Sequence, residues 1–230
     1  SPIGAAICRR LARSGMHVLI HAHANGARAE ALAADLAAEG HSAQAIVFDV
    51  CDFAAAGAAL APIIAAGVPQ VMVHNAGAHD DVPLAGMSEA QWRYVLDVSL
   101  NGFFNVLRPI ILPMIGTRWG RIIAISSVAA LTGNRGQVNY AAAKAGLHGA
   151  VRSLSREVAS RGVTANAVAP GIIASPAVEA VMDAKQIAAV VPAKRAGTPE
   201  EVADLVGFLA SDQAGYINGQ VVSINGGMAG

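Results

Sequence analysis

The sequence RIIAISS at residues 121–127, followed by NYAAAKAG at residues 139–146, decides the class of fold. The apolar run at residues 122–125 predicts a strand that is buried on both faces, as strands of parallel sheets are. Ser127 closely follows that run, so its hydroxyl is expected at the carboxyl end of the strand. Open α/β sheets bind ligands at this end of their strands, which makes Ser127 a candidate site residue.

Tyr140 and Lys144 are four residues apart, a spacing that places both side chains on one face of a helix. A phenol ordinarily has a pKa of ~10, which is too high for acid–base work at neutral pH. A neighbouring ammonium favours the phenolate and is expected to lower the pKa of Tyr140. An ordinary amphipathic helix shows the same spacing, so the pair alone leaves a structural role open.

Two further strand ends carry glycine or polar residues. The motif Asn75-Ala76-Gly77 follows one apolar run, and Pro170-Gly171 ends another. Because the carboxyl ends of parallel strands meet at one edge of a sheet, these motifs and the serine predict a single site.

Apolar runs alternate with helical stretches along the chain, as repeated βαβ units require. Strands are predicted at residues 17–21, 43–48, 70–74, 121–126, 163–168 and 221–224. Helices are predicted at residues 3–14, 27–39, 53–66, 89–115, 138–161 and 200–211. The fold class is therefore α/β, a single Rossmann-type doubly wound parallel sheet with helices on both faces. Residues 172–195 are the least regular and are expected to form a mobile helical flap over the site.

Composition excludes several classes of protein. Hydrophobic residues make up 54% of the 230 residues and charged residues 14%, which suits one large domain, residues 1–230, with a buried sheet. A net charge of +0 without charged blocks gives no indication of nucleic-acid binding. The apolar runs are expected to be too short to span a membrane. Cys8 and Cys51 lack the spacing of metal ligands, so buried thiols in a reducing cytoplasm are expected, with no metal site.

In order and spacing, these motifs resemble the classical short-chain dehydrogenase/reductase family over nearly the whole chain, and most closely its 3-oxoacyl-(acyl-carrier-protein) reductases. The stretches that carry the resemblance are residues 49–50, 75–77, 101–102, 125–127, 139–146, 168–171, 198–203 and 225–228.

The resemblance implies reversible hydride transfer between a nicotinamide and a carbonyl or alcohol carbon. Tyr140 would donate the proton, Ser127 would polarise the carbonyl, and Lys144 would hold the nicotinamide ribose and lower the tyrosine pKa. Asn101 matches the family asparagine that supports a kinked helix and a water linking the lysine to solvent.

The resemblance also implies a dinucleotide site. No acidic residue stands at the end of the second strand to hold the ribose of NAD, and His23 occupies a position where many members carry arginine, so NADP(H) is favoured. A solvated loop histidine is the alternative for His23. Asp49 and Val50 would contact the adenine. The remaining cofactor residues implied are Ile3, Gly4, Asn75, Ala76, Gly77, Pro170, Gly171, Ile173 and Ser175.

The family's first strand and the early part of its glycine-rich turn have no counterpart ahead of Gly4, with Pro2 standing where glycine is usual. The sheet would then have about seven strands with the first one absent, and the core should be open there. The natural protein is expected to begin roughly a dozen residues earlier.

Three functions compete at this point: a reductase of carrier-bound 3-oxoacyl thioesters, a short-chain enzyme for another alcohol or ketone such as a sugar or sterol, and a dinucleotide-binding protein without turnover. For the first, the resemblance implies that Arg118 and Arg161 flank the cleft and dock an acyl carrier protein, with two solvated arginines as the alternative. It also implies a homotetramer.

Overall fold

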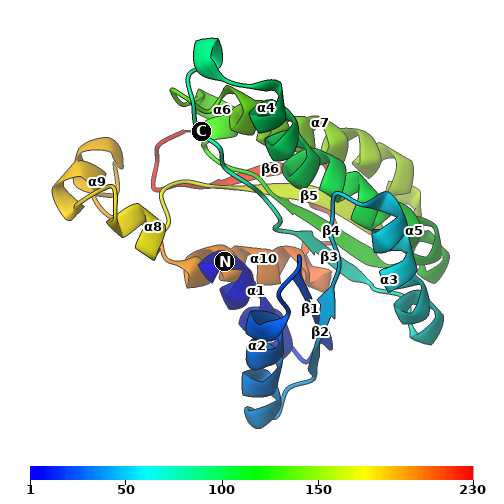
Figure 1. Cartoon of the computed structure of the whole chain (residues 1–230). Helices are drawn as coiled ribbons and strands as arrows, with labels where there is room; N and C mark the ends of the chain where they lie inside the picture. Colours follow the sequence, from blue (N-terminus) through cyan, green and yellow to red (C-terminus); the bar gives the residue numbers. More distant parts are fainter. Residues whose placement is uncertain (230) are drawn as a thin grey trace.

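Parallel strands and helices alternate in the predicted order in a computed structural model, which describes residues 1–229 (Figure 1). The predicted strands differ from the observed ones by at most two residues at either end. The strands are β1 (Val18–Ala22), β2 (Ala43–Val47), β3 (Val71–His74), β4 (Gly120–Ile125), β5 (Val163–Pro170) and β6 (Val221–Ile224).

Each predicted helix is also present, and polar caps define several of their starts. Ser88 and Thr198 each form a capping box, and Asp52 accepts from the backbone N–H of Ala55. The larger helices are α1 (Pro2–Arg13), α2 (Ala27–Ala38), α3 (Phe53–Ala66), α4 (Glu89–Leu96), α5 (Gly102–Thr117), α7 (Val138–Val158) and α10 (Pro199–Leu209).

The strands form two parallel sheets instead of the single sheet that was predicted. β1 pairs with β2, and the second sheet has the order β3-β4-β5-β6. Between β1 and β3 lies a cavity of about 1650 Å³, lined in part by α1. The expected opening of the core is therefore present, and it lies between the two sheets.

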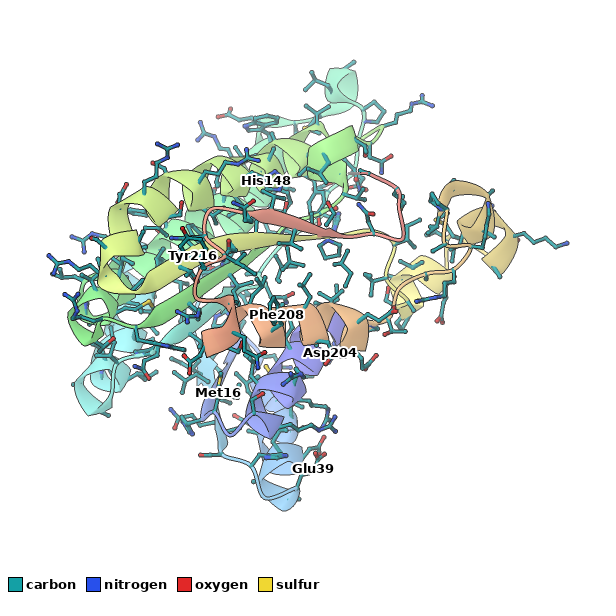
Figure 2. All side chains as sticks on the ribbon, turned by 180° about the vertical axis from the view of Figure 1, so that it is seen from behind. Met16, Glu39, His148, Asp204, Phe208 and Tyr216 are labelled. Carbon is teal, nitrogen blue, oxygen red and sulfur yellow. The ribbon has the colours of Figure 1, made fainter. Side chains whose placement is uncertain are left out.

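Helices cover both faces of the four-stranded sheet (Figure 1). α5 and α7 pack on one face, where Leu107, Met114 and Leu147 belong to one apolar cluster with Ile122 of β4. α10 packs on the other face and against α1. In Figure 2, Asp204 and Phe208 mark α10. Every residue of β4 and β5 is buried, so the strands beside the candidate site are enclosed on both sides.

The predicted helix at residues 89–115 is interrupted by a π-helical turn. This turn, η2 (Asp97–Asn101), lies between α4 and α5 and includes a hydrogen bond from Gly102 N–H to the Asp97 carbonyl. The helical run Glu89–Thr117 is long and apolar enough to cross a membrane by length and composition only. Asp97, Asn101 and Arg108 interrupt its apolar residues, so no continuous apolar run extends over it, in keeping with the prediction. The apolar side of α5 is used in the core, where Phe103, Leu107 and Met114 are buried.

Residues 172–195 contain two short helices, α8 (Pro176–Glu179) and α9 (Ala184–Val190), which project from the body at the left of Figure 1. The predicted irregular helical segment is confirmed, and its mobility stays a prediction. The two cysteines are free, but Cys51 is exposed, so the expectation of two buried thiols was wrong.

Candidate active site

Ser127, Tyr140 and Lys144 come together at the carboxyl edge of β4. Ser127 follows the strand, and the other two lie in the first turns of α7. The phenol lies beside the Ser127 side chain, near enough for the serine to lower the phenol's pKa. Lys144 Nζ lies 5.8 Å from the centre of the tyrosine ring. A hydroxyl, a phenol and an ammonium therefore face one small region, as the sequence predicts.

Two side-chain hydrogen bonds fix α7 to the end of β4. Lys144 Nζ donates to the carbonyl of Ile125 at 2.8 Å, two residues before the serine. Ser126 Oγ donates to the carbonyl of Lys144 at 3.1 Å and hydrogen-bonds with Nε2 of His148 at 2.7 Å. These buried contacts set the position of Tyr140 relative to Ser127, and His148 is a contributor that the sequence analysis missed.

The pKa of Tyr140 is raised, so the expected lowering was wrong for this structure. Burial of the phenol is the largest cause, and the neighbouring Ser127 side chain opposes it. The ammonium does not offset burial because it is directed at the Ile125 carbonyl and stays 5.8 Å from the ring centre. Burial also lowers the pKa of Lys144 to about 8. Tyr140 is therefore neutral at neutral pH, the form that can donate a proton.

Asn101 lies apart from this cluster, and Ser99 takes the position expected for it. Asn101 is exposed and donates to Asp97 Oδ1 at 2.6 Å within its own helix. Ser99 is fully buried, and its hydroxyl accepts from the Ala78 N–H at 3.3 Å. Ser99 lies four residues after the buried Val95 and four before the buried Phe103, on one face of the helix, whereas Asn101 lies on the exposed side. The signal that could have found Ser99 is this spacing of four from Val95 and Phe103.

His74, at the end of β3, is buried behind the lysine. Its Nε2–H donates to the carbonyl of Ser99 at 3.1 Å, and its ring packs edge-on against Phe103. Burial, with repulsion from Lys144, lowers the pKa of His74 to about 3. His74 is therefore a packed residue at the end of its strand.

Acid should destabilise the protein through His74. Its pKa is about 3 when folded and 6.5 when unfolded, so between these values the unfolded chain binds the extra proton. The free energy of unfolding is then highest above pH 6.5. It falls as the pH is lowered from 6.5 to about 3, by up to about 1.4 kcal/mol per pH unit. Urea unfolding at several pH values should show a steeper loss for the wild type than for His74→Gln, which keeps a donor. Parallel curves would contradict this expectation.

The ends of β1 and β2 hold the residues expected to bind the adenosine part of a dinucleotide. His23 Nδ1 lies 3.3 Å from Asp49 Oδ1, and both side chains are largely exposed. The backbone N–H of Cys51 and then the nearby His23 lower the pKa of Asp49, so it is a carboxylate able to accept a hydrogen bond. Val50 is buried, and its carbonyl accepts from Asn105 Nδ2.

The start of α1 meets the end of β3. Asn75 Nδ2 donates to Ser1 Oγ, which also accepts from the Gly4 N–H. A Cβ at Gly4 would lie 2.9 Å from Asn75 Nδ2, so this close approach requires glycine. Ile3 is in the same first turn, and Ala76 places its carbonyl 3.5 Å from Lys144 Nζ. The cofactor residues implied at the start of α1 and at the end of β3 therefore lie close together.

Residues 170–175 close the site after β5. Pro170 ends the strand, Gly171 packs directly on Asn225, and Ile173 bridges to Gly197. Ser175 caps α8 by accepting from the Val178 N–H, so its hydroxyl is used within the flap.

These residues fit a nicotinamide dinucleotide by their chemistry. Gly77 lies directly beside the lysine, since a Cβ there would be 3.0 Å from Lys144 Nζ. An ammonium, a carboxylate and a glycine-bearing helix start suit the hydroxyls, amino group and pyrophosphate of such a molecule. Across residues 1–229 there is no group of three or more metal-ligating side chains.

Arg118 and Arg161 do not flank this site. They lie next to one another, since a side chain at Gly162 would collide with the carbonyl oxygen of Arg118. They precede β4 and β5, which run in parallel register from Gly120 and Val163. The arginines are thus at the amino-terminal edge of the sheet, about 20 Å from the edge that carries Ser127. The prediction that they border one cleft with the site was wrong within a single chain.

Known proteins resemble this chain over nearly its whole length. A family model described as enoyl-(acyl carrier protein) reductase matches residues 1–229. The 3-oxoacyl-(acyl-carrier-protein) reductase FabG of Aggregatibacter actinomycetemcomitans is 42% identical, covering 98% of this chain and 94% of its own. Acetoacetyl-CoA reductase of Cupriavidus necator is 39% identical, covering 98% and 93%. A solved structure described as a possible gluconate dehydrogenase of Agrobacterium tumefaciens has a TM-score of 0.95 at 29% identity, covering 99% and 91%.

Proposed function

The chain belongs to the short-chain dehydrogenase/reductase family, and from that premise we propose that it reduces the 3-keto group of a 3-oxoacyl thioester with NADPH. The family makes it an oxidoreductase that uses a nicotinamide dinucleotide. The observation that supports the reaction is the pairing of the neutral phenol of Tyr140 with the Ser127 hydroxyl at the carboxyl edge of β4. Two relatives of about 40% identity, named for 3-oxoacyl-carrier and acetoacetyl-CoA reduction, support the substrate class.

The chain's own residues supply the acid and the alignment. The Ser127 hydroxyl would polarise the keto oxygen, and Tyr140 would give that oxygen its phenolic proton as negative charge develops. Lys144 would hold the nicotinamide ribose while its bond to the Ile125 carbonyl keeps α7 in register with β4. When bound, the reduced nicotinamide supplies the hydride to the keto carbon.

NADPH is proposed over NADH because of the end of β1. His23 is exposed there and no acid follows the strand directly, so a 2′-phosphate meets a histidine instead of a carboxylate. Asp49 is the counter-argument, since its carboxylate lies 3.3 Å from the His23 ring. Initial rates with NADPH and NADH at equal concentration test this preference, and equal kcat/KM values would contradict it.

The function is tested by following NADPH oxidation with three oxo compounds: a carrier-bound 3-oxoacyl thioester, the matching coenzyme A thioester, and gluconate-type keto sugars. Turnover of both thioesters supports the proposal, and a higher kcat/KM for the carrier form supports an acyl carrier protein as partner. Turnover of the keto sugar alone would favour the second candidate, a sugar dehydrogenase, which the 0.95 TM-score neighbour suggests. If both thioesters are turned over, we propose that the protein acts in acyl-chain synthesis in the cytoplasm.

A homotetramer is the expected assembly, because two separate surfaces expose apolar side chains. On α3 and α5, Phe53 stacks on Phe104 with ring centres 5.9 Å apart, and Leu112 is 70% exposed. Near α10, Phe208 and Tyr216 are exposed (Figure 2). Two distinct self-complementary patches suit closed dihedral symmetry. Sedimentation velocity at micromolar concentration should give a tetramer, and a monomer would contradict this prediction.

A further inference from the structure

His79 stacks on the ring of Tyr140. The two ring centres are 4.0 Å apart and the planes differ by 28°. Tyr140 is 9% exposed, whereas the His79 side chain is 56% exposed. The imidazole therefore covers the phenol ring and is itself accessible to a ligand that enters the site from solvent.

The segment that carries His79 is fastened to the helices on both sides of the site. Gln91 of α4 donates to Asp80 Oδ1 at 2.7 Å, and Asn139 of α7 donates to the Asp80 carbonyl at 3.1 Å. Gln137 donates to Asp81 Oδ2 at 2.6 Å. Side chains from two helices thus fix the backbone on the carboxyl side of His79, and its place over the phenol follows from those anchors.

The ring nitrogens of His79 are available to a ligand. Nδ1 lies 3.6 Å from Asp81 Oδ1, which is within ion-pair range but too long for a hydrogen bond. Within residues 1–229 neither ring nitrogen makes a hydrogen bond. A neutral imidazole carries one N–H and the charged form carries two, so the ring can donate to an oxygen placed beside Tyr140.

A 3-oxoacyl thioester has such an oxygen. Its thioester carbonyl is separated from the keto carbon by a single methylene, so a keto oxygen held by Ser127 and Tyr140 brings the second carbonyl beside the phenol. A simple ketone lacks this oxygen. A site that hydrogen-bonds a substrate group discriminates against analogues without it, because the site's polar group then loses its partner.

We propose that His79 is a specificity-determining residue that donates a hydrogen bond to the thioester carbonyl of a 1,3-dicarbonyl substrate. This inference rests on the proposed reduction of 3-oxoacyl thioesters and adds how the second carbonyl is recognised. Three observations support it: the segment that holds His79 is fixed by two helices, the imidazole stacks on the Tyr140 ring, and neither ring nitrogen makes a hydrogen bond within residues 1–229.

The test compares kcat/KM for acetoacetyl-coenzyme A with kcat/KM for a cyclic ketone that has no second carbonyl. His79→Phe keeps an aromatic ring on Tyr140 but has no donor, and His79→Gln keeps a donor. For His79→Phe we expect the thioester value to fall about 10- to 100-fold, mainly through KM, with the ketone value unchanged. His79→Gln should retain part of the preference. His17→Ala, at the opposite edge before β1, is the matched control and should leave both values unchanged.

Stacking alone predicts a different pattern. If His79 only supports Tyr140, His79→Ala would lower kcat/KM for the thioester and for the ketone by the same factor. His79→Phe would then have the wild-type kcat/KM for both substrates. That result would overturn the specificity role. If the unchanged protein reduces acetoacetyl-coenzyme A but His79→Phe keeps its preference, this inference fails while the proposed function stands. If the unchanged protein reduces only the ketone, both fail.

Discussion

Replacing Tyr140 with phenylalanine should lower kcat for a 3-oxoacyl thioester by about 10²–10⁴-fold, the range of general acid catalysis by a positioned side chain. The hydroxyl is the only group removed, and the ring keeps its buried place in the cluster with Val95 and Ala143 and its stack on His79. Burial raises the phenol's pKa, so the residue is a neutral acid before substrate arrives. The dissociation constant of NADPH should change little, because the hydroxyl acts on the substrate oxygen.

The measurement is single-turnover NADPH oxidation together with fluorescence titration of the cofactor. Tyr94→Phe is the matched control, since Tyr94 lies on α4 with 54% of its surface exposed. A Tyr140→Phe protein with the kcat of the unchanged protein would refute the assignment of the acid. Loss of NADPH binding would show that the substitution disturbs the site more widely than removal of one hydroxyl should.

Replacing Lys144 should reduce both turnover and cofactor affinity. Lys144 is 2% exposed and its ammonium donates to the Ile125 carbonyl, so the substitution removes a buried charge and leaves that carbonyl without its partner. Hydrogen bonds to charged groups are worth about 1.5–3 kcal/mol, so the NADPH dissociation constant should rise about 10- to 100-fold. We expect kcat to fall as well, because α7 loses a contact that aligns Tyr140 with Ser127.

Lys144→Met separates the charge from the packing. Burial lowers the pKa of the lysine from 10.5 to about 8, so the unfolded chain binds the extra proton between these values. The cost of the buried charge is full below pH 8 and is relieved as the pH rises to 10.5. At pH 7 the methionine variant should therefore unfold at no lower temperature than the wild type while losing activity. An unchanged NADPH affinity would contradict the role of Lys144 in binding the ribose. If the variant unfolds at a lower temperature than the wild type, its loss of activity would not support a role of Lys144 in aligning Tyr140 with Ser127.

The positions of Ser127, Tyr140 and Lys144 follow from local rules. An apolar run specifies a buried strand, parallel strands share a carboxyl edge, and a spacing of four places two side chains on one helix face. These rules need no knowledge of distant contacts. They therefore predicted the alternation of elements and the edge that carries the site.

Other properties depend on contacts between distant segments, and the tertiary structure alone decided them. Packing buried Ser99 and left Asn101 exposed, because the Ser99 hydroxyl accepts from the Ala78 N–H of a distant segment. The pKa of Tyr140 rose because packing around α7 desolvates the phenol and directs the ammonium elsewhere. His79 reached Tyr140 through anchors from two helices. The sequence determined which residues stand at the sheet's edge, whereas packing determined which atoms face one another and in which protonation state, because burial and hydrogen bonding act across segments that the chain order keeps far apart.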